Sequence, residues 1–457
     1  MASTEYLQAK THLVPALMSF WPTLQGFFAS HPVLSLDSWA SYYASVDPLH
    51  TAIVLCATSS TAVYIAHQIS GNASQVDRIW TFAPVWYGAH FTLQPVVAAK
   101  LVAHGWAKGS LAGALSDPVA KLTFWEYRAT IDSSFAAQLQ PRLALMLALQ
   151  LLWSARLTFN AWRRGFFKVG EEDYRWPELR RGMSRWQWEL FSLFFIAIAQ
   201  NVLLAITQLP QYLLLSTTFA NRNELKSSAS LQLTLSDRVL TALFILTLTV
   251  EFLADHQQQA YQNWKRGYKA SLFGLPQMRD DSDALSSSGA KLANANSSLK
   301  ATLFDRTGSE AELFSEADRK RGFVTRGLWA WSRHPNFACE QLVWWLLYGF
   351  VPITFGAALL SKSHTAGETF KYDHALLANY AVISPVAMGL LFAASTDFTE
   401  KMSMRKYPLY ASYRRVVSPF NPIDTLLRKA YFRVAVKEKT RLMLERDVWG
   451  EVEDKSQ

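Results

Sequence analysis

Residues 340–360 read EQLVWWLLYGFVPITFGAALL, an apolar run close to the roughly 20 residues of helix that cross the hydrocarbon core of a bilayer. Backbone polar groups cannot stay unpaired in lipid, and this run does not alternate as a barrel strand does, so we expect a helix. Similar runs occupy 50–68, 79–103, 141–160, 188–216, 236–254 and 374–396, with a weaker one at 12–30. The sequence therefore predicts an all-α fold, a polytopic integral membrane bundle of about seven (roughly six to eight) transmembrane helices.

Charge separates the connecting segments into two classes. The segments after 160, between 254 and 340, and after 396 are basic, whereas 104–140 and 361–373 balance bases with acids. Pairs of expected spans separate the three basic segments, so all three can lie on one side, and loops rich in Lys and Arg stay cytosolic. The net charge of +9 thus indicates topology, a cytosolic C-terminus and attraction to the lipid bilayer, with no reason to expect nucleic acid as a partner.

The chain is expected to divide into five parts. They are an N-terminal segment with room for one membrane-associated helix (1–48), N-terminal transmembrane helices (49–268), a Ser/Asn-rich cytosolic insertion that is largely disordered (269–325), a C-terminal domain (326–425) and a charged cytosolic tail (426–457). Cys56 and Cys339 are the two cysteines of the chain, so we expect neither a disulfide framework nor a metal site.

The stretch 327–348, GLWAWSRHPNFACEQLVWWLLY, carries the strongest chemical signal. Pro335 suits the start of a helix, and Asn336 and Glu340 lie one turn apart on it, just after Arg333. A carboxylate in the first turns of a membrane helix is costly and therefore indicates function. The alternative is an acid at a helix start, paired locally with Arg333 or a backbone N–H.

Two further polar segments lie beside expected spans. Glu251, Asp255, Gln258 and Gln262 recur at helical spacing where the run 236–254 ends. This stripe either binds nucleotide hydroxyls or marks where the helix enters water. After the last run, the stretch 396–422 reads TDFTEKMSMRKYPLYASYRRVVSPFNP and combines tyrosines with basic residues. It either binds phosphate and a flat base or lies on anionic lipid.

These residues resemble a known family. The RHPNF stretch with Glu340, followed by two spans and the YPLYASYRRVVSPFNP tail, is similar to the C-terminal domain of the steroid 5-alpha-reductase superfamily. Upstream, VDRIW (76–80), LWSARLTFN (152–160), GEEDYRW (170–176) and EFLADHQQQAY (251–261) resemble its DUF1295-type branch of membrane oxidoreductases. Motifs for a Rossmann domain, a P-loop or a zinc protease are absent from the sequence.

The resemblance implies a membrane-embedded reductase, an oxidoreductase acting on CH–CH groups, that transfers hydride from NADPH to an activated C=C bond of a sterol or other lipid. It implies the endoplasmic reticulum as the membrane. The expected cofactor-binding residues are Asp255, Arg333, His334, Asn336, Glu340, Arg405, Tyr413 and Arg414. The expected catalytic residues are Glu340, Tyr407 and Tyr410, and Tyr174 is a further candidate donor to a developing oxyanion.

One departure from the steroid reductases keeps a rival open. Those enzymes carry a Tyr about seven residues before the Tyr-Pro pair of the tail, where this chain has Glu400. A similar core and tail occur in membrane methyltransferases of the isoprenylcysteine or phospholipid type, which bind S-adenosylmethionine. These usually carry a Glu-Glu pair ahead of the tail, whereas this chain reads TDFTE at 396–400. A third hypothesis is a non-enzymatic membrane scaffold of the same fold.

Overall fold

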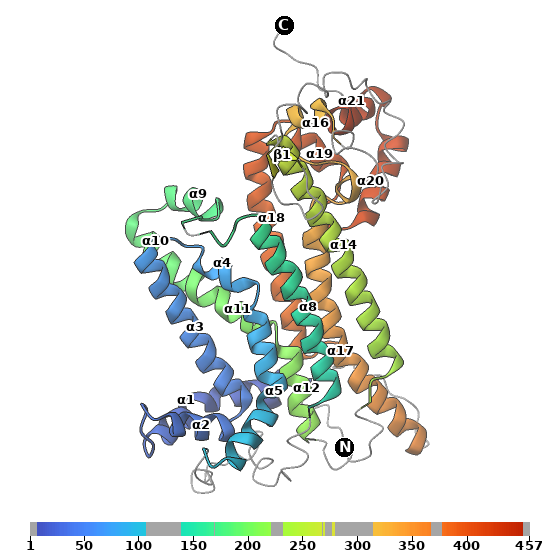
Figure 1. Ribbon diagram of the computed structural model, residues 1–457. Helices are drawn as coiled ribbons and strands as arrows, with labels where there is room; N and C mark the ends of the chain where they lie inside the picture. Colours follow the sequence, from blue (N-terminus) through green and yellow to red (C-terminus); the bar gives the residue numbers. More distant parts are fainter. Residues whose placement is uncertain are drawn as a thin grey trace. The chain divides into compact units, whose positions relative to one another are not determined.

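A computed structural model describes residues 7–106, 139–168, 170–220, 232–266, 268–269, 277–278, 314–366 and 377–450 (Figure 1). The chain forms two compact units. Unit 1 comprises Met1–Thr158, Phe166–Ile245 and Trp344–Met388, and unit 2 comprises Phe159–Gly165, Leu246–Val343 and Gly389–Gln457. Helices dominate the described residues, and the strands among them are the two-residue pair β1 (Tyr268–Lys269) and β2 (Gln277–Met278). The predicted all-α fold is confirmed.

Within the part of the chain that the structure describes, five helical stretches have the length and composition of membrane spans. They are α3 (Pro48–Ser70), α8 (Pro141–Arg163), the stretch Arg185–Ile206, α14 (Leu235–Lys265) and the stretch Tyr380–Lys406, which contains α18 (Ile383–Lys406). Two other runs expected to span are also helical, as α5 (Ala83–Ala103) and α17 (Pro335–Ala366). The chain is thus an integral membrane protein built from helices.

The run 188–216, expected as one span, is divided in two. Its first part comprises α10 (Arg185–Phe191), the π-helical stretch η5 (Ser192–Ala199) and α11 (Gln200–Ile206), and its second part is α12 (Leu209–Ala220). Pro210 explains the division, because proline lacks an N–H and its ring clashes with the carbonyl four residues earlier in a continuous helix. Proline fits the first turn of a new helix instead.

Unit 1 starts with η2 (Ala9–Leu13), α1 (Val14–Phe28) and α2 (Leu36–Ser45). A buried polar network fixes these elements. Asp47 caps α3 by accepting from the Leu49 N–H at 2.8 Å and also accepts from the Tyr212 hydroxyl at 3.2 Å. The His12 ring, stacked on Tyr212, lies with Nδ1 2.8 Å from the Tyr380 hydroxyl. These contacts satisfy the Asp47 carboxylate and the hydroxyls of Tyr212 and Tyr380, as buried polar groups require.

Two of the sequence segments that carried the resemblance meet in unit 1. They lie on α4 (Gln75–Trp80) and at the start of α9 (Arg175–Arg181). Asp77 of VDRIW accepts from Trp176 Nε1 of GEEDYRW at 2.7 Å. Burial raises the pKa of the Asp77 carboxyl, and the positive charge of Arg175 opposes that rise. This contact is structural.

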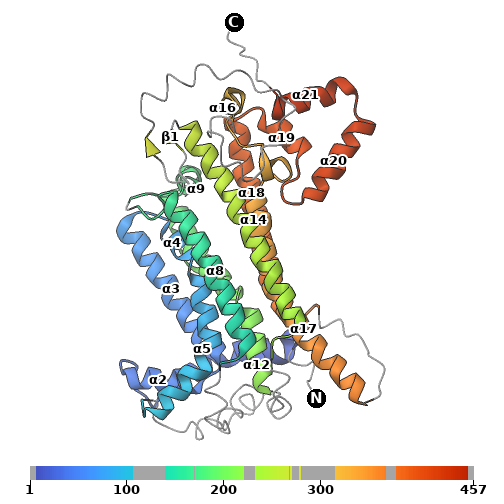
Figure 2. The same ribbon diagram turned by 45° about the vertical axis from the view of Figure 1, so that its right-hand side comes forward.

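Unit 2 contains the ends of α14 and α18, the start of α17 and several short helices. These are α16 (Glu316–Arg321), η10 (Gly327–Ala330), α19 (Tyr410–Val416), α20 (Pro422–Ala435) and α21 (Glu438–Trp449). Figure 2 shows α19, α20 and α21 grouped together, with α20 at the edge of the group. Their shared core holds Phe323, Tyr410, Tyr413, Leu444 and Val448.

Parts of the expected insertion and of the expected tail are helical in unit 2. The Ser/Asn-rich middle of 269–325 lies outside the described residues, but 314–325 contains α16, whose start is capped by Ser315. The expected tail from 426 onward continues α20 and forms α21, which buries Leu444 and Val448. The boundary expected after 425 therefore falls inside a helix.

Candidate functional site

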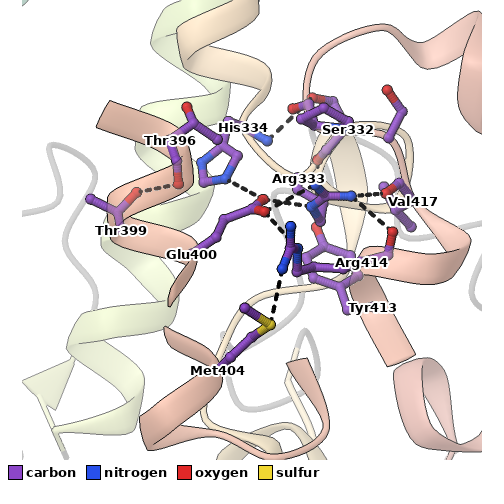
Figure 3. Close-up of polar contacts among 12 residues, drawn as sticks. Ser332, Arg333, His334, Thr396, Thr399, Glu400, Met404, Tyr413, Arg414 and Val417 are labelled. Atoms are coloured by element: carbon purple, nitrogen blue, oxygen red, sulfur yellow. Dashed lines mark hydrogen bonds and ion pairs between the residues drawn. The ribbon is translucent and has the colours of Figure 1, made fainter. Parts of the chain in front are cut away.

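A buried carboxylate, Glu400, organises the polar centre of unit 2 (Figure 3). It lies near the C-terminal end of α18, and its Oε1 accepts from Arg333 Nε at 2.6 Å. Arg333 Nη2 donates to Glu400 Oε2 at 3.1 Å, which makes the pair bidentate. Both side chains are at least 95% buried. A buried ion pair needs such close geometry and further partners to offset the loss of hydration.

Two more basic side chains surround the same carboxylate. Arg414 Nε of α19 lies 2.8 Å from Glu400 Oε2, and His334 Nε2 lies 3.0 Å from Glu400 Oε1. Arg333 extends the network to the carbonyls of Arg414 and Val417. Glu400 thus joins α18 to the turn before α17 and to α19.

The chain around Arg333 is held by backbone contacts. The Arg333 N–H donates to the Ser418 carbonyl at 2.8 Å, and the His334 N–H donates to the Pro419 carbonyl at 3.0 Å. Pro335 follows as the first residue of α17, where its missing N–H costs no helical bond. The residues of the RHP sequence therefore have separate structural roles: Arg333 and His334 contact Glu400, and Pro335 begins α17.

Beside this network lies an open depression of about 460 Å³. Four arginines line it: Arg333, Arg414, Arg415 and Arg428. Two carboxylates face them, because Glu400 pairs with Arg333 and Arg414, and Asp424 pairs with Arg428. Arg415 is exposed. Guanidinium groups in this number suit an anion with several oxygens, such as a phosphate.

A second polar group joins α14 to the start of α17. Asn336 Nδ2 donates to Asp255 Oδ1 at 3.0 Å. Asp255, Glu251 and Glu340 are all buried. Asn336 Oδ1 and Gln258 Oε1 are also buried, and neither accepts a hydrogen bond from the residues that the structure describes. Two buried acceptors without donors are unusual, since such groups are nearly always paired.

The tail tyrosines fall into two environments. Tyr407 is half-buried, and its hydroxyl accepts from Lys265 Nζ at 2.9 Å. Burial disfavours ionisation of Tyr407, but the hydrogen bond and charge of Lys265, together with Lys406, outweigh it and lower its pKa. Tyr410 is buried, and burial followed by the Glu400 charge raises its pKa.

Two other residues expected to bind a cofactor have different surroundings, Tyr413 in a core beside the polar centre and Arg405 at the surface. Tyr413 is fully buried in the core of unit 2, and its hydroxyl donates to the Trp329 carbonyl. Arg405 is exposed, near the end of α18. Tyr413 therefore has a structural position that sequence spacing could not distinguish from a position in a site.

The predicted site residues form two groups, and one residue was missed. Arg333, His334 and Arg414 meet at one carboxylate, whereas Asp255 meets Asn336. The sequence spacing had suggested that Arg333, Asn336 and Glu340 share one face, but Arg333 pairs with Glu400 and Asn336 with Asp255. Glu400 was noted in the sequence as a departure from the steroid reductases and was not expected in the site. The available signal was its position, an acid at the end of an apolar run that is followed by basic residues.

Comparison with known proteins places the chain in a family. The family model described as "Protein of unknown function (DUF1295)" matches residues 122–361, more than half of the chain. The chain belongs to the DUF1295 family. The match includes Asp255, Arg333, Asn336 and Glu340, so this part of the candidate site lies inside the DUF1295 region, whereas Glu400 lies beyond it.

A relative of similar extent is known from fission yeast. An uncharacterized protein of Schizosaccharomyces pombe is 28% identical over 385 residues, which cover 84% of this chain and 83% of the relative. No solved structure matches the chain. The likeness to the yeast protein thus extends well beyond the DUF1295 region, over most of both chains.

Proposed function

We propose that this DUF1295 protein is a membrane-embedded reductase that uses NADPH to transfer hydride to an activated C=C bond of a sterol or other lipid. The resemblance of the RHPNF stretch and the tail to the steroid 5-alpha-reductase superfamily supports the reaction class. The observation that carries the proposal is the buried, unpaired Asn336 Oδ1 beside Asp255, together with a second buried, unpaired amide oxygen, Gln258 Oε1, three residues after Asp255 on α14.

These oxygens favour a ligand rich in hydrogen-bond donors. A buried acceptor left unpaired costs about 1–3 kcal/mol, so a ligand that supplies N–H or O–H groups recovers that free energy on binding. The carboxamide of nicotinamide and the ribose hydroxyls offer such groups. Asp255 is buried beside Asn336 and adds a charged acceptor for a hydroxyl.

The arginine-lined depression fits the phosphate part of the same cofactor. Arg333 lies three residues before Asn336, in the turn that precedes α17, so the chain itself links the two polar groups. Arg333 is committed to Glu400, whereas Arg415 is exposed and Arg428 pairs with a half-exposed carboxylate. We expect Arg414, Arg415 and Arg428 to contact phosphate, and Arg333 to hold Glu400 and Arg414 in position.

Among the candidate catalytic tyrosines, Tyr407 suits proton donation better than Tyr410. When bound, NADPH would supply the hydride, and the protein must supply a donor to the developing oxyanion. The lowered pKa of Tyr407 beside Lys265 favours release of its proton, whereas the raised pKa of Tyr410 opposes it. Glu340 is buried one turn after Asn336 and remains a candidate for positioning the nicotinamide.

Binding to the purified protein in detergent tests the proposal. We expect NADPH to bind to the wild type. Asn336→Ala and Glu340→Gln should each abolish binding and NADPH-dependent turnover while expression stays intact. Lys401→Gln is the control, because Lys401 is exposed on α18 and pairs with the exposed Asp397. Wild-type turnover in both site variants would refute the assignment.

The same measurement separates the alternatives. Binding of S-adenosylmethionine in place of NADPH would indicate a methyltransferase, and binding of neither would indicate a scaffold. The basic segments favour a site at the cytosolic face of the membrane. The resemblance to the steroid 5-alpha-reductase superfamily favours the endoplasmic reticulum as that membrane. A lipid profile of cells with and without the protein would identify the substrate class.

A further inference from the structure

Helix α20 turns a wide apolar face away from the protein, unlike a helix on the surface of a soluble domain. Ile423, Leu426, Leu427, Tyr431 and Val434 are all exposed, from 50% at Leu426 to 90% at Val434. Their spacing of three and four residues places them on one face. An amphipathic helix in water normally turns such a face toward the core.

The opposite face of α20 contacts the protein through Phe432, which packs against the core of unit 2, and through the polar residues Thr425 and Lys429. The buried Thr425 hydroxyl donates to the Trp331 carbonyl at 2.6 Å and accepts from the Ser418 N–H at 2.8 Å. Lys429 Nζ lies 4.5 Å from the centre of the Trp331 ring and 4.9 Å from that of Trp449. These contacts fix the rotation of the helix, so the apolar face cannot turn inward without breaking them.

The helix is well formed at its start. Asn421 Oδ1 accepts from the Ile423 N–H at 2.9 Å, and Pro422 occupies the first turn. Its outward apolar face is therefore a fixed feature of unit 2 and needs a covering environment, because several large apolar side chains gather on it.

We infer that α20 lies in the surface of a lipid bilayer that contains anionic phospholipid, with its Leu427–Val434 face among the acyl chains. Unit 2 is already next to a bilayer, because α18, a membrane span, ends at Lys406, only 16 residues before α20 begins. Basic side chains flank the apolar face at Arg433 and Lys437, which complements anionic headgroups.

The residues beside α20 also suit the interface between lipid headgroups and water. Trp331 is partly exposed beside Lys429, and tryptophan is enriched where headgroups meet water. A second copy of this chain or another protein would not require the flanking positive charge. The charge therefore favours lipid as the occupant.

Spin labels on the full-length protein in lipid nanodiscs test this inference. In a Cys56→Ser/Cys339→Ser background, nitroxides are attached at Leu427→Cys, Val434→Cys and, as a water-exposed reference on α21, Lys439→Cys. In discs of phosphatidylcholine with phosphatidylserine, we expect the ratio of oxygen to nickel-chelate accessibility to be several-fold higher at 427 and 434 than at 439. The difference should shrink in phosphatidylcholine alone and after Arg433→Glu/Lys437→Glu.

Two outcomes would overturn the inference. Equal ratios at 427, 434 and 439 would place the face in water. Exclusion of both reagents at 427 and 434 would show that protein covers it. An unchanged melting temperature of the cysteine-free background and of each label variant in detergent confirms that the fold is intact.

Discussion

Arg333 and Glu400 are 67 residues apart in the chain, yet their side chains form a bidentate ion pair in which both partners are buried. Glu400 also contacts Arg414 and His334, so one carboxylate holds two arginines and a histidine together. The pair joins the start of α17 to the end of α18. This places the RHPNF stretch and the basic tail of the sequence in one polar centre.

Glu400→Gln should destabilise the protein strongly. Glutamine keeps the shape but removes the charge, which leaves buried Arg333 without its counterion, and breaking one side of a buried pair costs about 3–5 kcal/mol. Thermal or chemical unfolding in detergent measures the loss. The matched control is Lys401→Gln, the adjacent residue in an exposed pair with Asp397, which should change stability by about 1 kcal/mol or less. Equal effects of the two substitutions would contradict the role assigned to Glu400.

The apolar runs predicted the helical membrane fold because the length of a span and the need to pair backbone groups are local properties of the sequence. Helical spacing also predicted that Asp255 and Asn336 present side chains at helix ends, and they meet. The role of Glu400 could not be predicted in this way, since it depends on a contact between helices that are distant in sequence. The burial of Tyr413 in a core follows from packing and has no local signal.

Tyr407 should be the tyrosine of the tail that ionises first as pH rises. Its pKa lies below the usual 10, because Lys265 and Lys406 stabilise the phenolate more than burial disfavours it, whereas burial raises the pKa of Tyr410 and Tyr413. Tyr407→Phe should remove the earliest component of an ultraviolet titration of tyrosinate in the folded protein. Lys265→Met should shift that component to higher pH. An unchanged titration in both variants would show that the Lys265 contact has no effect on ionisation.

The sign of the pH effect on stability follows from the same shift. A phenol whose pKa is lower in the folded than in the unfolded protein contributes stability above pH 10, and this contribution is lost as pH falls through the folded value. As pH rises from the lowered pKa of Tyr407 toward 10, the wild type should therefore gain stability relative to Tyr407→Phe. The difference in melting temperature between the two proteins, followed against pH, measures the gain.

Gly322→Ala should be more damaging than Gly71→Ala. Each glycine directly follows a helix and has a positive φ, 89° at Gly322 and 64° at Gly71. A residue with a side chain in this conformation lowers stability by about 1–3 kcal/mol. A Cβ at Gly71 meets open space, whereas a Cβ at Gly322 would overlap the Tyr407 ring. Melting temperature compares the two variants. Gly322→Ala should also raise the pKa of Tyr407 by moving its ring away from Lys265, and Gly71→Ala should leave that pKa unchanged.

Helix α21 should be necessary for the stability of unit 2, although the sequence suggested that its residues belong to a tail. Leu444 is 3% exposed in the core with Tyr413 and Val448, whereas Leu442 on the same helix is 51% exposed. Leu444→Ala should lower the free energy of unfolding by about 2–5 kcal/mol, because it leaves a cavity, while Leu442→Ala should change it by about 0.5 kcal/mol or less. Unfolding in detergent measures both. The two changes remove the same atoms from one helix, so only the position of the side chain differs. Equal effects would mean that α21 is not packed against α19. The polar centre at Glu400 would then lack the support that this core provides.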